Sequence, residues 1–313
     1  MLRTSSTLTL VLVGLSACTV DYDISKIDPA LQEAPELVDS DVPVDEVPEV
    51  IEAPPEDEVP EPEPEPELPD DPPPEDDCED TSDLVYAISR DGNGLYLFDP
   101  VTVTFDYLGD LDCDMWGTPN SMGIARDGMA YVRWSDETLY QVDLQTLQCT
   151  PTSYGQQSSF GAFGMGFATE SAGSWRDELF VANASSLARL NTQTWQLDPI
   201  GPLPSQSELT GNADGELWAF LPLEQPAALV RLSKTDGQPE EFMSLQGFPS
   251  AYEIDAFAFA HWGGDFWLFV RTYGVGSSSD VYRVDANGQM TVAARRVGFD
   301  IVGAGVSTCA PSQ

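Results

Sequence analysis

The amino-acid sequence predicts an all-β protein, a single β-propeller of five blades that is closed by the C-terminal strand and follows a disordered tether. Three observations lead to this fold class. A segment of alternating apolar and polar residues recurs at intervals of 42 to 52 residues, which is the length of a propeller blade. A run of small residues lies upstream of four of the copies, and the counterpart for the remaining copy lies near the C-terminus.

The recurring segment ends in a polar turn residue in most of its copies. The copies are residues 95–99, 139–143, 187–191, 229–233 and 281–285. Asp99, Asp143, Asn191 and Asp285 are typical of Asx-turns, in which the side chain accepts a hydrogen bond from the backbone two residues later. Each copy is therefore interpreted as a strand followed by a tight turn.

A second strand precedes each copy and carries an aromatic residue at its third position. These residues are Tyr86, Tyr131, Phe180, Trp218 and Trp267. Two-residue turn signals such as Asp127-Gly128 and Asp214-Gly215 precede several of these strands. Because the two patterns share one register, we expect most aromatic side chains to fill the spaces between neighbouring sheets.

The innermost strand of each blade is expected to be rich in glycine and alanine, because these strands crowd around the axis. Candidate strands lie at residues 121–125, 164–168, 209–213 and 256–259. The fifth is found at residues 302–307. The C-terminal strand would thus complete the blade that begins near Leu84, and the ring would have no unpaired edge.

The N-terminal region predicts a lipoprotein signal peptide over residues 1–17. Arg3 and the apolar residues 8–13 form a signal sequence that is too short to span a bilayer. Leu15-Ser16-Ala17-Cys18 resembles a bacterial lipobox, in which cleavage precedes a cysteine that becomes lipidated. An ordinary signal peptide with a chance cysteine is the alternative. Thr19 in place of aspartate favours an outer-membrane lipoprotein, at the periplasmic face or the cell surface.

Residues 18–80 are predicted to be a disordered acidic tether, and residues 81–313 the propeller domain. Fourteen prolines lie between Pro29 and Pro74, and from Thr19 to Asp83 Lys26 is the one basic residue among 26 acidic ones. Proline favours polyproline II and like charges extend the chain, so a spacer is the simplest interpretation. An acidic arm that collects calcium or docks a protein is the alternative.

The charge and the histidine content exclude several classes of function. The chain has a formal net charge of −40, and 27 acidic and 11 basic residues from Leu84 onward give the folded part −16. Such a protein is repelled by nucleic acids, so no nucleic-acid partner is expected. The single histidine, His261, excludes a multi-histidine metal site and argues against a histidine-based triad.

Four cysteines remain once Cys18 is assigned to the lipid, an even number for an oxidising compartment. Three pairings are possible. Cys78 lies just before the first blade and Cys309 just after the last strand, so a Cys78–Cys309 bond would fasten the closed ring. Cys113 and Cys149, which follow the outer regions of neighbouring blades, would then form the second bond.

These features together resemble uncharacterised bacterial lipoproteins with a C-terminal β-propeller, found in predatory, gliding bacteria. The resemblance rests on the lipobox cysteine, the Pro/Glu-rich tether, the Leu-Tyr-x-Val-Asp-x-x-Thr repeats and the ending Val302-Gly303-Ala304-Gly305-Val306-Ser307-Thr308-Cys309. It covers nearly all of the mature chain. It implies the architecture and no known activity, so it implies no catalytic residues.

Polar residues at or just before the innermost strands are the candidate ligand-binding residues. They are Asn120, Glu208, Glu253, Asp255 and Asp300. Because the starts of these strands converge on one end of the axis, we expect a ligand site there. Four crowded carboxylates repel one another unless a cation, a proton or sugar hydroxyls offset the charge. Ca²⁺ is therefore a conceivable ligand, and no other cofactor is predicted.

The expected function is a lipid-anchored envelope module that binds protein or glycan, because signatures of nucleophile–base pairs and cofactors are missing. The alternative is a hydrolase or lyase that acts on polysaccharide through the axial carboxylates, since glycoside hydrolysis uses two carboxylates roughly 5–10 Å apart. A purely structural envelope component is a third option. Trp116 and Trp175 fall outside the strand pattern and are candidate exposed stacking platforms.

Overall fold

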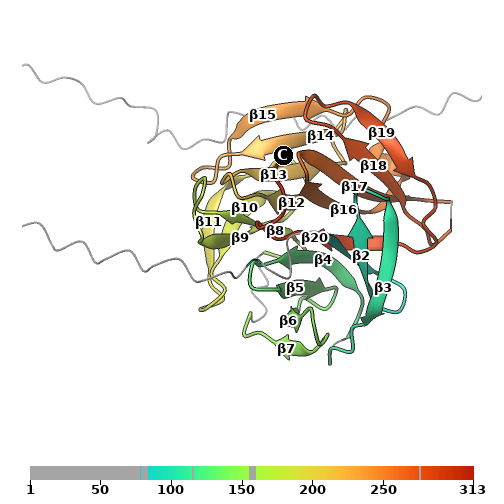
Figure 1. Cartoon of the computed structure of the whole chain (residues 1–313). Coiled ribbons are helices and arrows are strands. Elements are labelled where there is room, and N and C mark those ends of the chain that lie inside the picture. Colours follow the sequence, from blue (N-terminus) through green and yellow to red (C-terminus); the bar gives the residue numbers. More distant parts are fainter. Residues whose placement is uncertain (1–77, 79–83, 115, 155–159, 275) are drawn as a thin grey trace, which may run out of the picture. The chain divides into compact units, whose positions relative to one another are not determined.

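The computed structural model describes residue 78 and residues 84–114, 116–154, 160–274 and 276–313. The predicted signal peptide, Cys18 and the tether, apart from Cys78, lie outside the described residues. The described residues form five four-stranded antiparallel sheets, which confirms the predicted five-bladed propeller. Figure 1 shows the inner strands β4, β8, β12, β16 and β20 gathered near the centre, with β3, β7, β11, β15 and β19 at the periphery.

The twenty strands follow one order from the axis outward in every blade. The first blade contains β20 (Ile301–Gly305), β1 (Val85–Ser89), β2 (Gly94–Asp99) and β3 (Thr104–Asp110). The second contains β4 (Pro119–Ile124), β5 (Met129–Trp134), β6 (Leu139–Asp143) and β7 (Cys149–Pro151). The third contains β8 (Gly164–Thr169), β9 (Asp177–Ala182), β10 (Ser186–Leu190) and β11 (Leu197–Pro202).

The last two blades repeat this order. The fourth contains β12 (Glu208–Gly211), β13 (Leu217–Leu221), β14 (Ala228–Leu232) and β15 (Pro239–Ser244). The fifth contains β16 (Ile254–Trp262), β17 (Asp265–Thr272), β18 (Asp280–Val284) and β19 (Met290–Ala294), and the short 3₁₀ helix η3 (Ala251–Glu253) precedes it. No helix among the described residues combines the length and the apolar character that crossing a membrane requires.

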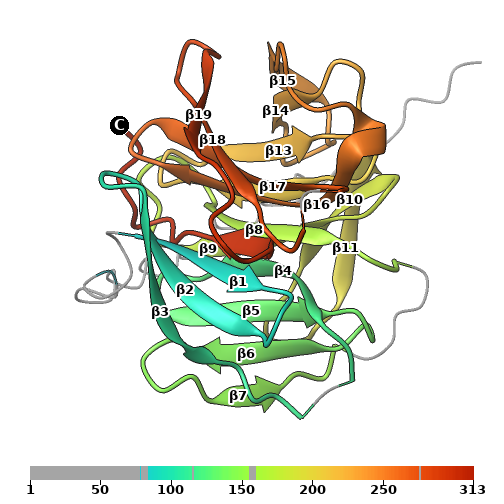
Figure 2. The same cartoon turned by 90° about the vertical axis from the view of Figure 1, so that its right-hand side faces the viewer.

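The C-terminal strand closes the ring, as predicted. β20 pairs antiparallel with β1, with Ala304 opposite Ala87, so the first blade joins the last part of the chain to the beginning of the domain. Figure 2, in a view turned by 90°, shows β1, β2 and β3 of this blade side by side. The closure gives β1 a hydrogen-bonded partner on its inner side and so completes the four-stranded sheet of the first blade.

The core is divided into five apolar clusters, each between two neighbouring blades. All five aromatic residues at the third position of the second strand are buried, with exposed fractions of at most 7%. Between blades one and five, for example, the Trp267 ring meets the Phe98 ring edge-on at a centroid distance of 5.1 Å. The predicted role of these aromatic residues as inter-blade filling is confirmed.

The predicted turns are also present. Gly128 and Gly215 have positive φ angles of 79° and 78°, which an L side chain rarely adopts, and this is why glycine occupies the turns before β5 and β13. In the recurring turns after the third strands, Asp143 Oδ1 accepts hydrogen bonds from the backbone N–H groups of Gln145 and Thr146, both at 2.9 Å. Asp99, Asn191 and Asp285 accept the corresponding backbone hydrogen bonds, so an Asx-turn joins the third and fourth strands in four of the blades.

The two ends of the axis differ. We call the end at which the innermost strands begin the entry face, and the end at which they finish the exit face. The C-terminal segment, residues 306–313, runs along the exit face. Thr308 Oγ1 donates to the Asp177 carboxylate of blade three at 2.8 Å, and the Pro311 carbonyl accepts from the Gly263 N–H of blade five at 2.7 Å.

Both predicted disulfides are present. Cys78 is bonded to Cys309 with 5.6 Å between their Cα atoms, and Cys113 to Cys149 with 5.2 Å. The first bond fastens the beginning of the domain to the segment that follows β20, which is the predicted ring fastening. It also attaches the chain upstream of Cys78 through a residue that follows the exit end of β20.

Candidate functional site at the entry face

A cavity of about 280 Å³ lies at the entry face. Its polar lining consists of Arg90, Thr118, Asn120, Gln206, Glu208 and Asp255. Its apolar lining consists of Pro119, Ala256, Phe257 and Val302. These residues come from four of the five blades, so the cavity is a property of the closed ring and of no single sheet.

The strand directions explain why residues so distant in sequence meet here. Asn120, Glu208 and Asp255 lie at the first or second residue of the innermost strands β4, β12 and β16. All innermost strands start at the entry face, so these three side chains lie around the same point. The structure thus brings together three of the five residues that the sequence singled out, and Asp300 lies immediately behind them.

Asp255 and Asp300 are balanced by two arginines. Arg90 approaches Asp255 Oδ2 with Nη1 at 3.3 Å and Asp300 Oδ2 with Nε at 3.4 Å. Arg271 reaches the same two oxygens with Nε at 3.2 Å and Nη1 at 2.7 Å. Asp300 is fully buried, so its charge depends on these partners. The four side chains form a network without net charge.

Glu208 is the most buried carboxyl group that lines the cavity. It is 4% exposed, and Ser121 Oγ donates a hydrogen bond to its Oε2 at 2.9 Å. Burial raises the pKa of Glu208 to about 8, and the Ser121 hydrogen bond opposes this shift only in part. At neutral pH this side chain is therefore mainly a neutral carboxylic acid, which can both donate and accept a hydrogen bond.

Gly164, at the start of β8, makes room for the Glu208 side chain. A Cβ atom at Gly164 would lie 2.8 Å from the carboxyl carbon of Glu208. The third blade, from which the sequence predicted no site residue, therefore contributes by the absence of a side chain.

Asn120 lines the cavity and has one polar atom without a partner among the described residues. Its Oδ1 atom is buried and has no hydrogen-bond partner in the described part of the chain. A buried polar atom without a partner costs on the order of 1–3 kcal/mol, so the fold bears this cost at a residue that lines the cavity.

Glu253 does not belong to this cavity, which corrects the expectation that it would converge with Asp255. It is exposed in η3, and its Oε2 accepts hydrogen bonds from the backbone N–H and the hydroxyl group of Ser250, both at 2.9 Å. It lines a different surface hollow together with Thr272 and Asp280. The chain turns through η3 before β16 begins, and this turn points two carboxylates only two residues apart in different directions.

Sequence reasoning did not identify Arg90 and Arg271. It followed the starts of the innermost strands, whereas these arginines lie at the far ends of the second strands β1 and β17. A second strand runs antiparallel to its innermost neighbour and ends at the entry face. Basic residues at the ends of the predicted second strands were therefore the sequence signal that could have identified Arg90 and Arg271 as part of the site.

Because Arg90 and Arg271 pair with Asp255 and Asp300, these two carboxylates do not require the cation that the sequence led us to consider. The charges of Asp255 and Asp300 already have partners within the protein. Within the described ranges, no group of three or more histidine, cysteine, aspartate or glutamate side chains is arranged to hold a metal ion. The chemistry of the cavity is that of a neutral set of hydrogen-bond donors and acceptors beside an aromatic ring.

Three highly exposed aromatic residues lie close to the cavity in the chain. Trp116 is 88% exposed and precedes Thr118 by two residues, and Tyr252 and Tyr273 are 92% and 65% exposed. The Tyr273 N–H donates to the Glu253 carbonyl at 2.8 Å, which holds the two tyrosine-bearing loops together. Trp175, the other predicted stacking platform, is half-buried. The Arg176 guanidinium lies over its ring, with Cζ 5.0 Å from the ring centroid.

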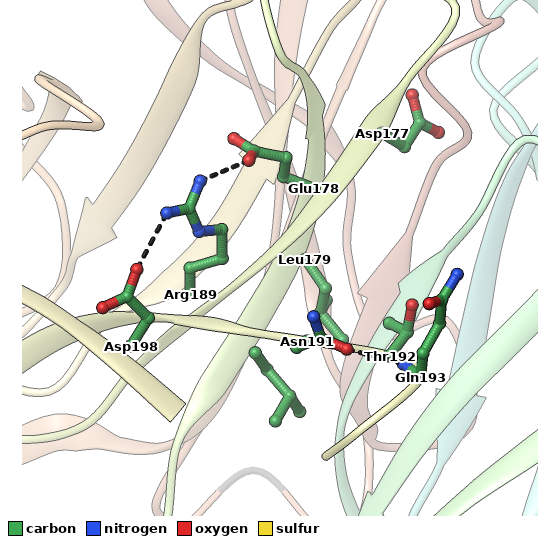
Figure 3. A pocket seen from close by; sticks show the side chains of 9 residues that line it. Asp177, Glu178, Leu179, Arg189, Asn191, Thr192, Gln193 and Asp198 are labelled. Carbon is green, nitrogen blue, oxygen red and sulfur yellow. Dashed lines mark hydrogen bonds and ion pairs between the residues drawn. The ribbon is translucent and has the colours of Figure 1, made fainter. Parts of the chain in front are cut away.

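A second polar cavity, of about 420 Å³, lies in the third blade near the exit face. Figure 3 shows Arg189 between Glu178 and Asp198, with the Nη2–Asp198 Oδ2 distance at 2.8 Å. Asp177 lies apart from this group in Figure 3 and accepts from Thr308. The charged groups of this second cavity are thus engaged with one another, with Arg126 or with the C-terminal segment. Asn120 Oδ1, in contrast, has no hydrogen-bond partner among the described residues.

Comparisons with known proteins provide no family. No family model and no curated protein matches the chain. Among solved structures, a protein of unknown function from Bacteroides caccae has 10% identity and a TM-score of 0.40, over 71% of this chain and 97% of its own. The mitotic checkpoint complex has 11% identity and a TM-score of 0.39, over 73% and 79%. Similarities at this level carry no information about function.

Proposed function

We propose that this protein is a binding module of the cell envelope, anchored through a lipid on Cys18, and that the entry-face cavity holds part of its ligand. The observation that carries the proposal is the convergence of Arg90, Asn120, Glu208 and Asp255 on one cavity. A concave site with a few convergent polar groups beside an apolar wall is the usual form of a ligand site.

The position of Cys78 supports this proposal. Cys78 is bonded to Cys309, which follows the exit end of β20. Val302, at the entry end of the same strand, lines the cavity. Cys78, the described residue that follows the predicted tether in the chain, is thus fixed beside the exit end of β20 and not at the entry face. This arrangement suits a domain that presents a site away from its anchor.

Hydrolysis of polysaccharide is the second candidate, and one observation favours it. The raised pKa of Glu208 would let this residue donate a proton to a leaving oxygen, while Asp255 lies in the same cavity. Against it, Asp255 Oδ2 is held in ion pairs with both Arg90 and Arg271, so this carboxylate is already engaged by partners within the protein. Binding therefore remains the leading proposal.

The proposal is tested by filling the cavity. The purified full chain is mixed with fractions of an envelope extract, and its thermal unfolding is followed. We expect one fraction to raise the Tm of the wild type, since a ligand at 100 times its Kd stabilises by about 2.7 kcal/mol. Asn120→Trp should remove this increase, because the indole would occupy the cavity.

Gln193→Trp is the matched control, because Gln193 lines the cavity of the third blade. It should keep the increase in Tm. An increase that survives Asn120→Trp, or a wild-type chain that no fraction stabilises, would refute the proposed site. Release of reducing sugar from the active fraction by the wild type, lost in Glu208→Gln, would show the hydrolase instead.

A further inference from the structure

We propose that the ligand of the entry-face cavity is an uncharged glycan, with one sugar unit in the cavity and the adjoining units on Trp116, Tyr252 and Tyr273. This inference rests on the proposed function and assigns the chemical class of the ligand. It follows from the charge of the site, its hydrogen-bonding groups and its exposed aromatic residues.

The charges select against ionic ligands. Arg90 and Arg271 neutralise Asp255 and Asp300 through four contacts of 2.7–3.4 Å, so no excess charge faces the cavity. The domain as a whole carries a formal charge of −16 from Leu84 onward, which repels anionic polymers such as uronates at long range. Cations find no unpaired carboxylate in the network.

The hydrogen-bonding groups match hydroxyl groups. Asn120 Oδ1 is a buried acceptor without a partner, and Glu208 lies in the same cavity as a carboxyl group that can donate as well as accept. A sugar hydroxyl also donates and accepts, so sugar hydroxyls match the hydrogen-bonding character of both groups. The half-buried ring of Phe257 offers an apolar wall to the C–H face of a sugar ring.

The exposed aromatic residues extend the site beyond one sugar. Trp116 belongs to the loop that leads into blade two, while Tyr252 and Tyr273 belong to blade five, and these two blades flank blade one with Arg90. The exposure of Trp116 does not come from a loose loop. The backbone N–H of Trp116 donates to Asp136 Oδ2 at 2.9 Å, and the backbone N–H of Thr118 donates to Ser135 Oγ at 3.1 Å.

Because these hydrogen bonds hold the backbone at Trp116 and Thr118, a ligand that stacks on the indole has mainly the side-chain rotamers to order. The exposed rings of Trp116, before blade two, and of Tyr252 and Tyr273, in blade five, would offer stacking surfaces to a chain of sugars, since each pyranose has a flat C–H face. A compact apolar peptide would instead require a continuous apolar patch around the opening, and the cavity is lined mainly by polar side chains.

The experiment uses polysaccharide from the envelope of the source organism, split by anion exchange into a neutral flow-through and a retained anionic pool. Native affinity electrophoresis of the full chain measures retardation in gels that contain each pool. We expect retardation by the neutral pool, and loss of it after periodate oxidation of that pool. Trp116→Ala and Asn120→Leu should each weaken binding at least ten-fold.

Phe242→Ala is the matched control, because Phe242 is 60% exposed on the outer strand of blade four, away from the cavity. It should bind like the wild type. Retardation by the anionic pool alone, or wild-type affinity in Trp116→Ala, overturns the inference. If the active envelope fraction of the thermal assay is destroyed by protease and survives periodate, the glycan assignment is wrong while the proposed binding site stands.

Discussion

Glu208 shows how one residue can carry a functional property and a structural cost together. Its side chain is 4% exposed, and the lack of a side chain at Gly164 admits it to the cavity. Burial raises its pKa to about 8 from an ordinary 4.5. A proton is thus held by the folded state over a pH range in which the unfolded chain has released it.

This difference predicts how stability depends on pH. Below pH 4.5 Glu208 is protonated in both the folded and the unfolded state, so its titration does not affect stability. Between pH 4.5 and about 8 only the folded state holds the proton, so the free energy of unfolding falls as the pH rises. Above about pH 8 the loss is complete. Glu208→Gln should flatten this fall and raise the Tm at pH 8 relative to the wild type.

The measurement is thermal unfolding of both chains at pH 5, 7 and 9. Glu253→Gln serves as the control, because Glu253 is exposed and its pKa is lowered by hydrogen bonds from Ser250. Its curve should not gain stability at high pH. Parallel pH profiles for the wild type and Glu208→Gln would show that Glu208 does not titrate in this range.

Among the elements, the innermost strands are the most tightly packed. β8 and β12 approach so closely that a Cβ atom at Gly166 would lie 2.6 Å from the Leu209 carbonyl oxygen and 2.9 Å from the Thr210 Cα atom. These are backbone atoms and cannot rotate away. The predicted crowding of small residues at the axis therefore has a direct structural cause.

Gly166→Ala is expected to destabilise the domain by about 2 kcal/mol or more, because the two strands must move apart. Gly123→Ala, in β4, is the matched control: its nearest neighbour would be Met165 Cγ at 3.3 Å, and a methionine side chain can adjust. Denaturant unfolding compares the two variants. Equal losses of stability would contradict the close backbone approach as the cause.

At the scale of the whole molecule, a single strand and a single disulfide close the ring. Cys78–Cys309 joins residues 231 positions apart, while Cys113–Cys149 spans 36. On the chain-entropy model these bonds stabilise by about 5 and about 4 kcal/mol respectively. The larger value belongs to the bond that holds the start of the domain to its end.

Replacing both Cys78 and Cys309 by serine should lower the free energy of unfolding by a few kcal/mol and leave the fold intact, since β20 still pairs with β1. The Cys113/Cys149 double serine variant is the comparison and should lose less. Equilibrium unfolding under non-reducing conditions provides both values. An unchanged stability without Cys78–Cys309 would show that the strand pairing suffices.

The anchor also acts on the whole molecule, and its prediction comes from the sequence. Cys18→Ser should leave an unlipidated precursor that does not incorporate labelled fatty acid, because the thiol that accepts the lipid is gone. Cys78→Ser should still be labelled. Incorporation of label into the Cys18→Ser chain would refute the lipobox interpretation.

The sequence alone determined the number of blades, the closure by the last strand and the two disulfides. These follow from local patterns that are repeated: strand alternation, turn residues such as Asp143 and Gly128, and cysteines at the two ends of the ring. Each repeat carries its own information, so five copies reinforce one another. No such repetition marks the cavity.

Only the tertiary structure decided which charged residues meet. Asp255 and Glu253 are two residues apart and face different hollows, because η3 turns the chain between them. Arg90 and Asp300 are 210 positions apart and form an ion pair, because β1 runs antiparallel to β20. Strand ends are joined by the closed ring, and a linear pattern of residues does not encode which ends will lie together in space.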